Sequence, residues 1–171
     1  MRYRDIKPYE DGYWAKNRIA LKHATKSRID TENKSVLLSD GSSIAYDKLI
    51  IATGSESNMF GWPGQDLPCV QCLYSLQDLE SMEENTKGIR RAVIVGGGLI
   101  GVEMAEMLRT RNIAVTFLVR EDSFWGGILP KQEADMIVRH MQEHGVELKF
   151  NTELKEIIAG DDGRVAAVRR K

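Results

Sequence analysis

Cysteine and histidine are scarce in this chain of 171 residues, which contains two cysteines and three histidines. Two cysteines are too few for the disulfide framework that stabilises many small secreted proteins. The histidines and the single cysteine pair do not supply the ligand set of a structural zinc site. We therefore expect neither a disulfide-stabilised fold nor a bound metal.

Long apolar runs, low-complexity segments and an excess of positive charge are also missing. No segment approaches the roughly 20 apolar residues of a membrane-spanning helix. Residues 1–5 lack the apolar core of a signal peptide. The formal net charge is −1 at pH 7, so no basic field indicates nucleic acid as a partner. These absences predict a soluble, cytoplasmic, globular protein that binds neither membranes nor nucleic acids.

What the chain does contain is a strand–glycine–helix pattern at its centre. The apolar residues 92–95 run into a G-x-G-x-x-G string at Gly96, Gly98 and Gly101, and a helical pattern and a second apolar run at 115–119 follow. This context is typical of a dinucleotide-binding loop. The first glycine permits a sharp turn, the second allows the backbone to approach a pyrophosphate, and the third lets the helix pack on the sheet. The N–H groups of the first helical turn then face the phosphates. We predict that the loop contacts the cofactor through Gly96, Gly97, Gly98, Leu99, Ile100 and Gly101.

The end of the second strand indicates which nicotinamide dinucleotide is bound. An acidic residue roughly 20 positions after the first glycine favours NAD, whereas an arginine favours the 2′-phosphate of NADP. Here Val119 stands at the strand end and Arg120 follows it, with Glu121 and Asp122 still within reach of the ribose. This pattern favours NADPH over NADH, with Val119, Arg120 and Glu121 as contacts. Trp125, a little further on, is a candidate either for stacking on the adenine or for packing on the next helix.

Alternating strands and helices surround this motif. A helix is expected from Ser75, with Asp78 completing its capping box, and another at 131–144; a strand follows at 146–150 and a hairpin at 154–168. This alternation favours parallel pairing through right-handed crossovers. We predict an α/β fold, a Rossmann-like parallel sheet with flanking helices, together with an antiparallel β-hairpin region.

The first third of the chain has a different pattern, predicting a short helix within residues 1–17 and two or three antiparallel strands. The strands are expected at 19–21, 24–29 and 35–38. Residues 49–52 are continuously apolar, which is typical of a strand buried on both faces. The turn-rich segment 61–64 marks a boundary, so we predict domains at 1–65 and 66–171.

Two of these motifs make the chain similar to the pyridine nucleotide–disulfide oxidoreductase family. Residues 49–54 (LIIATG) match the family's "ATG" strand beside FAD, and residues 93–107 (VIVGGGLIGVEMAEM) match its NAD(P)H-binding fingerprint. The two occur in the family's order, and the resemblance covers most of residues 19–168. It implies an FAD lobe and an NAD(P)H lobe, with hydride passing from the nicotinamide to the flavin, and a homodimer for the intact protein.

The resemblance also assigns roles to individual residues. It implies that Ala52, Thr53 and Gly54 lie at the FAD edge and that Glu103 faces the nicotinamide and the flavin. The segment after residue 119 resembles that of the NADPH-using glutathione reductases, but Gly126 stands where they carry a second arginine.

Several parts of the family pattern are missing from these residues: the glycine loop for the FAD pyrophosphate, a later Gly-Asp segment at the flavin and the C-terminal dimerisation domain. We therefore expect a remnant of the FAD lobe at 1–65 and an NAD(P)H lobe at 66–171 without its last strand, inactive alone. Two alternatives stay open. One is a non-catalytic nucleotide-binding or interaction module, and the other is a thiol redox protein using the C-x-x-C pair Cys69 and Cys72.

Overall fold

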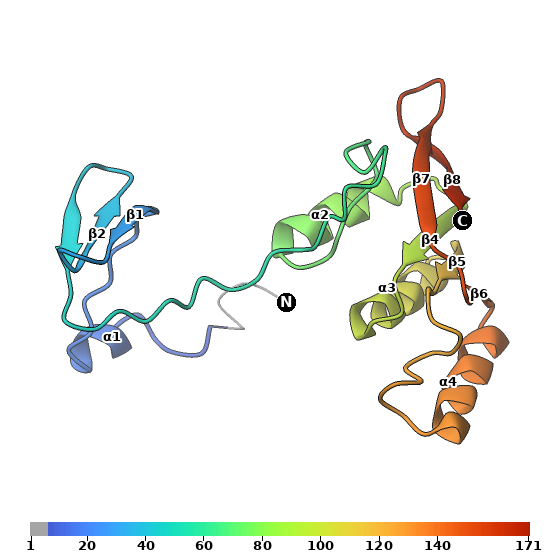
Figure 1. The fold of residues 1–171 in the computed structure, drawn as a ribbon, viewed down its shortest axis with the longest axis horizontal. Helices are drawn as coiled ribbons and strands as arrows, with labels where there is room; N and C mark the ends of the chain where they lie inside the picture. Colours follow the sequence, from blue (N-terminus) through green and yellow to red (C-terminus); the bar gives the residue numbers. More distant parts are fainter. Residues whose placement is uncertain (1–6) are drawn as a thin grey trace. The chain divides into compact units, whose positions relative to one another are not determined.

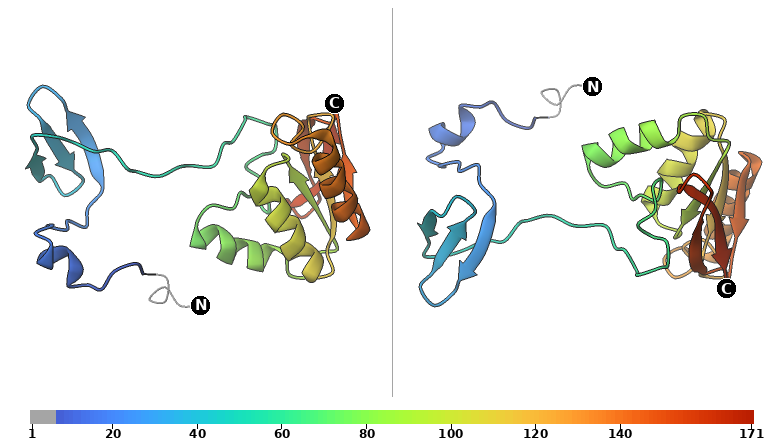
Figure 2. Two further views of the ribbon diagram at one scale, coloured as in Figure 1. Left: turned by 90° about the horizontal axis from the view of Figure 1, so that it is seen from below. Right: turned by 90° about the horizontal axis from the view of Figure 1, so that it is seen from above.

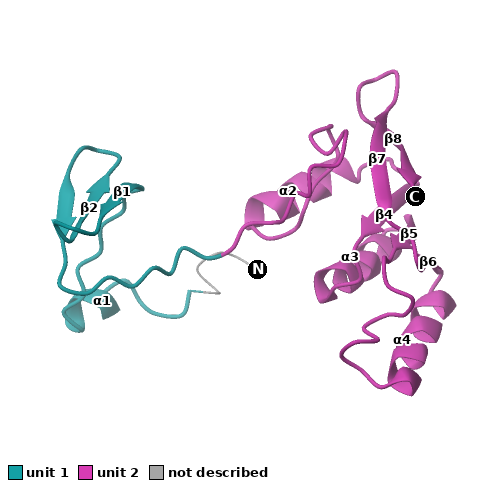
Figure 3. Ribbon diagram, viewed as in Figure 1, with its two compact units in different colours: residues 1–54 teal, residues 55–171 magenta. Residues whose placement is uncertain are grey.

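The structure, a computed structural model, describes residues 7–171. Residues 1–6, where the predicted N-terminal loop begins, lie outside the described residues. The chain forms two compact units, one that extends to Gly54 and one from Ser55 to Lys171 (Figure 3). The domain boundary expected at residue 65 stays a prediction. None of the helices in the described part of the chain is long and apolar enough to cross a bilayer.

The first unit contains a short helix and one small antiparallel sheet (Figure 1). Helix α1 is formed by Tyr13–Lys16, and the sheet has the order β1-β2-β3. The turn between β1 and β2 is held by the carboxylate of Asp30, which accepts hydrogen bonds from the backbone N–H groups of Glu32 and Asn33 at 3.1 and 2.9 Å. The short helix and the strands expected at 24–29 and 35–38 are thus confirmed, whereas the third strand, β3, was not predicted. The strands are β1 (Lys26–Asp30), β2 (Ser35–Leu38) and β3 (Ser43–Ala45).

Two strands predicted in this unit are wrong. Residues 19–21 form no strand, and the third strand of the sheet comes from β3 instead. Residues 49–52 are also not a strand, and Ile50 and Ile51 are 88% and 65% exposed. A strand needs a hydrogen-bonded neighbour and its burial needs covering layers. No described segment pairs with residues 49–52, so their apolar character alone does not produce a strand.

The second unit has the predicted order of strands and helices. Strands β4, β5 and β6 form a parallel sheet in the order β4-β5-β6, and β7 and β8 form an antiparallel hairpin. Predicted and observed bounds differ by one or two residues at most termini. The elements are α2 (Leu76–Asn85), β4 (Arg91–Val95), α3 (Leu99–Thr110), β5 (Ala114–Leu118), α4 (Lys131–Glu143), β6 (Val146–Lys149), β7 (Leu154–Ala159) and β8 (Val165–Arg170).

The start of α2 shows how local sequence sets an element boundary. Ser75 Oγ accepts a hydrogen bond from the Asp78 N–H at 3.2 Å, and the Asp78 carboxylate accepts one from the Ser75 N–H at 2.8 Å. The Asp78 carboxylate also accepts a hydrogen bond from the Tyr74 N–H at 3.0 Å. The bond from Ser75, and then that from Tyr74, lowers the pKa of Asp78 because both favour the ionised carboxylate. The reciprocal bonds satisfy N–H groups that have no acceptor inside the helix. The predicted capping box is confirmed.

The core of the second unit lies between one face of the parallel sheet and two helices. Register places Ile94, Phe117 and Leu148 side by side on that face, and Phe117 is completely buried. Helices α3 and α4 cover it through Ala105, Leu108 and Met141, and Figure 2 shows both helices on the same side of the sheet. This core sets the position of the loop between β4 and α3. The other core members are Ile113, Val115, Val119, Phe124 and Val146.

Candidate functional site

The glycine loop connects the carboxyl end of β4 to the amino end of α3. Gly96 has φ = +101°, a conformation that side chains disfavour, and its N–H extends the parallel ladder to the Leu118 carbonyl at 3.0 Å. Gly98 is the N-cap of α3, with φ = −83° and ψ = 171°. The chain therefore turns at Gly96 and enters the helix directly after Gly98.

Gly98 and Gly101, the second and third glycines of the motif, have different surroundings. A Cβ added to Gly98 meets no atom within 4 Å, so its backbone is open to a ligand. A Cβ added to Gly101 would lie 2.6 Å from Phe117 Cζ and 3.0 Å from the Gly96 carbonyl oxygen. Gly101 is thus required for packing of α3 on the sheet, and Gly98 leaves the space that a pyrophosphate needs.

The first turn of α3 supplies the chemistry of an anion site. The first N–H groups of an α-helix have no intrahelical acceptor, and its dipole places partial positive charge at this end. Leu99 and Ile100 are 67% and 53% exposed, so this turn is accessible. The arrangement can hold phosphate oxygens through backbone N–H groups without any cationic side chain.

Val119 lies beside the glycine loop, as the parallel pairing of β4 and β5 requires. Its backbone is bonded on both sides, with its N–H to the Lys149 carbonyl at 2.9 Å and its carbonyl to the Thr152 N–H at 3.0 Å. Its side chain is 1% exposed, and Cγ1 lies 3.3 Å from a Cβ added to Gly97. The buried side chain therefore packs against the glycine loop at Gly97. The predicted contact of Val119 with a cofactor stays a prediction.

Arg120 and Glu121 form an exposed ion pair just beyond Val119. Arg120 Nη2 donates to Glu121 Oε1 at 3.0 Å, and the two side chains are 74% and 55% exposed. The pKa of Glu121 is lowered by its own backbone N–H and then by the Arg120 guanidinium, both of which donate to the carboxylate. Each charge partly offsets the other at the place where the adenosine ribose is expected.

Trp125 contacts the glycine loop directly, a role that sequence reasoning missed. Its indole Nε1–H donates to the Gly97 carbonyl oxygen at 2.5 Å. Its ring is tilted against Phe124, which is completely buried, with centroids 5.0 Å apart. Residues 97 and 125 are 28 positions apart. The only sequence signal was an aromatic residue shortly after the strand end.

The remaining predicted site residues are exposed. Glu103 lies on α3 with its side chain exposed, and its predicted approach to the nicotinamide and flavin stays a prediction. Ala52, Thr53 and Gly54 belong to the first unit, where Gly54 has φ = +79°. Their place at an FAD edge is likewise a prediction.

The two cysteines have different partners. Cys69 Sγ accepts hydrogen bonds from Arg164 Nε at 3.1 Å and Nη2 at 2.9 Å, and the pKa of Arg164 is raised chiefly by these bonds. Cys72 Sγ instead lies 3.6 Å from Met59 Sδ. Both thiols are free and partly buried. The C-x-x-C spacing therefore does not produce a disulfide here.

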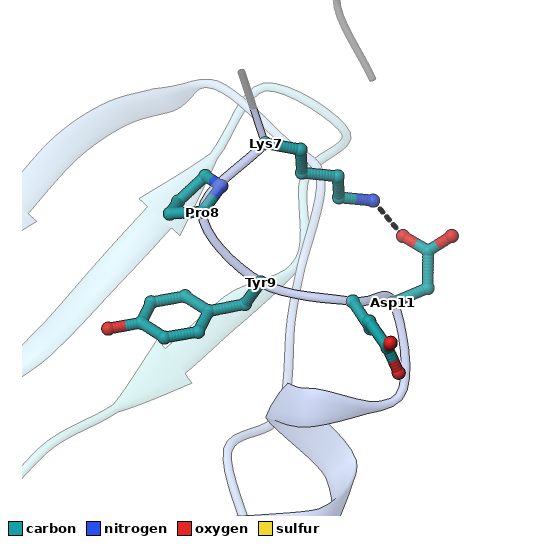
Figure 4. Close-up of a pocket in the computed structure, with 5 residues that line it drawn as sticks. Lys7, Pro8, Tyr9 and Asp11 are labelled. Carbon is teal, nitrogen blue, oxygen red and sulfur yellow. Dashed lines mark hydrogen bonds and ion pairs between the residues drawn. The ribbon is translucent and has the colours of Figure 1, made fainter. Parts of the chain in front are cut away.

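Two surface hollows are lined by residues other than those of the glycine loop. One lies on α4, against Gln132 and Arg139. The other is formed by residues 7–11, where Lys7 pairs with Asp11 and Tyr9 faces away from that pair (Figure 4). Neither hollow includes a residue predicted to bind a cofactor. Among residues 7–171 no three metal-ligating side chains are grouped together.

Comparison with known sequences connects this geometry to a family. A sequence model described as "Pyridine nucleotide-disulphide oxidoreductase" matches residues 11–171. The benzene 1,2-dioxygenase system ferredoxin–NAD(+) reductase subunit of Pseudomonas putida is 35% identical over 124 residues, which are 72% of this chain and 30% of that protein. Rhodocoxin reductase of Rhodococcus erythropolis is 33% identical over 141 residues, covering 82% of this chain and 33% of that protein. The chain thus spans about a third of the length of these relatives.

Solved structures agree on the fold. The ferredoxin reductase for the CYP199A2 system from Rhodopseudomonas palustris superposes with a TM-score of 0.89 at 22% identity, covering 99% of this chain and 42% of that one. A NAD-dependent persulfide reductase from A. fulgidus superposes with a TM-score of 0.79 at 28% identity, covering 90% of this chain and 29% of that one. The α/β fold with a parallel sheet is confirmed. With the glycine loop on its parallel sheet and a family match over residues 11–171, the chain belongs to the pyridine nucleotide-disulphide oxidoreductase family.

Proposed function

We propose that this chain forms the NAD(P)H-binding lobe and an adjoining part of the FAD lobe of a flavin-dependent oxidoreductase. Hydride transfer between nicotinamide and flavin is the chemistry that these cofactors supply when bound. The residues of this chain bind and orient the nicotinamide dinucleotide. Because relatives are named as ferredoxin reductases, we propose a small iron–sulfur protein as the acceptor for the whole protein. The chain alone would bind nucleotide without turnover.

One observation carries this proposal, the open backbone at Gly98. It lies at the N-cap of α3, with no atom within 4 Å of an added Cβ, while Gly96 turns the chain and Gly101 packs against Phe117. A glycine turn that only packed would have its glycines filled by neighbouring atoms. Here the space at Gly98, the glycine assigned to the pyrophosphate, is open, as it is at Gly96, and of the three motif glycines only Gly101 is closed in by its neighbours; this fits a dinucleotide.

The direct test is calorimetric titration of the purified chain with NADH and with NADPH. We expect saturable binding of one dinucleotide at one site, since the loop and its helix are complete in this unit. ADP-ribose should compete, because the predicted contacts are to the pyrophosphate and ribose. Heat changes no larger than those of buffer for both nucleotides would refute the proposal and favour a non-nucleotide interaction module.

For the choice of cofactor we propose NADH rather than the NADPH that the sequence pattern favours. Arg120, the residue that would hold a 2′-phosphate, is already paired with Glu121. The Glu121 carboxylate can accept a hydrogen bond from a ribose 2′-hydroxyl and would repel a phosphate. The name of a relative, a ferredoxin–NAD(+) reductase, supports the same choice.

Neutralising Glu121 or Arg120 should change the preference between NADH and NADPH in opposite directions. Glu121→Gln releases Arg120 and should raise the affinity for NADPH by up to about fivefold, the upper range for an exposed charge pair. Arg120→Gln should lower NADPH affinity and leave NADH binding unchanged. Glu143→Gln is the matched control, because it removes an exposed acidic charge at the C-terminal end of α4 and not at the strand end, and it should leave the preference unchanged. A wild-type chain that binds NADPH more tightly than NADH would overturn the proposal.

The thiol alternative makes a separate prediction. Because Cys69 and Cys72 have different partners and neither contacts the glycine loop, Cys69→Ser/Cys72→Ser should bind NADH with the wild-type dissociation constant. Titration of both proteins under reducing conditions checks this. A double variant that loses nucleotide binding would instead connect the C-x-x-C pair to the function.

A further inference from the structure

The indole of Trp125 is bonded to the middle of the glycine loop. Its N–H donates to the Gly97 carbonyl oxygen at 2.5 Å, and its ring packs beside the buried Phe124. The Trp125 carbonyl accepts hydrogen bonds from the N–H groups of Ile128 and Leu129 at 2.8 and 2.9 Å. The backbone bonds therefore hold the loop after β5 together, and the side chain connects that loop to the loop after β4.

This bond determines the direction of the neighbouring N–H. The peptide unit between Gly97 and Gly98 is planar and trans. Its C=O and N–H therefore point in opposite directions. With the carbonyl of Gly97 held by the indole, the N–H of Gly98 points in the opposite direction within the peptide plane, away from the indole. On the side away from the indole, this peptide therefore offers a donor and not a carbonyl oxygen, which would repel phosphate.

A glycine triplet needs such an anchor. Glycine has the largest backbone freedom of any residue, and Gly96, Gly97 and Gly98 follow one another here. Side-chain packing contributes little restraint at Gly98, because a Cβ added there would meet no atom within 4 Å. Trp125 itself has φ = +53°, an unusual conformation for a bulky residue. Surrounding contacts must impose such a conformation, and it places the indole on the loop.

We propose that Trp125 is a positioning residue, which holds the Gly97–Gly98 peptide with its N–H directed at the dinucleotide pyrophosphate. This inference rests on the proposed function and adds a residue outside the glycine motif to the site. Trp125 acts through the peptide and not by stacking on the adenine. Pre-ordering the loop in this way lowers the entropic cost of binding.

The test separates the indole N–H from the aromatic ring. Trp125→Phe keeps a ring beside Phe124 and removes the donor. We expect the NADH dissociation constant to rise by about five- to tenfold, and tenfold corresponds to about 1.4 kcal/mol. Trp125→Ala should weaken binding to a similar extent. If the ring stacked on adenine, Trp125→Phe would bind like the wild type and only Trp125→Ala would lose affinity, which would overturn the inference.

A second readout does not depend on nucleotide binding. In ¹⁵N relaxation measurements, the Gly98 N–H of the wild type should show the order parameter of a rigid backbone, about 0.85, and Trp125→Phe should lower it towards about 0.6. Trp62→Phe is the matched control, because Trp62 packs on Phe60 and lies outside the glycine loop. It should leave both readouts unchanged.

The NADH dissociation constant and the Gly98 order parameter distinguish failure of the proposed function from failure of the positioning role. A wild type that binds no nucleotide refutes the proposed function, and the Gly98 order parameter then decides the role of Trp125 alone. Wild-type order at Gly98 in Trp125→Phe would refute the positioning role whatever the affinity.

Discussion

Gly101→Ala should lower the free energy of unfolding of the chain by about 1–3 kcal/mol, the usual cost of overpacking a core. The added Cβ would lie 2.6 Å from Phe117 Cζ, well inside van der Waals contact. Phe117 cannot move away easily, because it is completely buried and packs edge-on against Phe124 with ring centroids 5.8 Å apart. The same methyl group would come within 3.0 Å of the Gly96 carbonyl oxygen. Helix α3 would have to shift away from the sheet. Urea unfolding followed by circular dichroism measures the change.

A second substitution tests the stated cause. Gly101→Ala/Phe117→Leu removes the ring that the new methyl group meets, so it should be less destabilised than the sum of the two single variants. Gly127→Ala is the matched control, since an added Cβ there meets no atom within 4 Å, and it should be nearly neutral. Additive effects in the double variant would contradict the contact between Gly101 and Phe117 as the cause.

Gly98→Val should weaken NADH binding at least tenfold, about 1.4 kcal/mol or more, without unfolding the protein. The two branches of valine would occupy the space from which a pyrophosphate approaches the Gly98 N–H. The backbone at Gly98 is extended, with φ = −83° and ψ = 171°, so valine fits without strain. Calorimetric titration gives the affinity, and thermal unfolding shows that the fold persists.

Gly12→Val is the control for this loss of affinity. Gly12 is likewise the N-cap of a helix, α1, with no atom within 4 Å of an added Cβ, but it belongs to the first unit. The Gly12→Val variant should bind NADH with the affinity of the wild type. Binding by Gly98→Val with unchanged affinity would show that the ligand does not approach this backbone. The pair Gly98 and Gly101 then separates binding from packing within one motif.

Local patterns predicted most elements of the second unit. The capping box of Ser75 and Asp78 depends on residues three positions apart, and it formed as expected. The apolar period of α4 likewise matched the helix Lys131–Glu143, with Ala134 and Met141 buried. Such signals lie within one or two turns of chain and need no distant partner.

The two strands that were wrongly predicted failed for a common physical reason. Residues 19–21 and 49–52 have strand-like composition, but a strand forms only where another segment donates and accepts its backbone hydrogen bonds. That partner is set by tertiary pairing and not by the segment itself. Ile50, 88% exposed, shows how little its own hydrophobicity decides.

By itself the sequence determined the glycine motif, the alternation of strands and helices around it, and the family resemblance, because all three are encoded in residues close together in the chain. Only the tertiary structure decided what lies against the motif. It brought Trp125 to Gly97, across 28 residues, and Arg164 to Cys69, across 95. It placed Phe117 beneath Gly101 and left Gly98 open. These contacts join segments far apart in the chain, which no single stretch of sequence specifies.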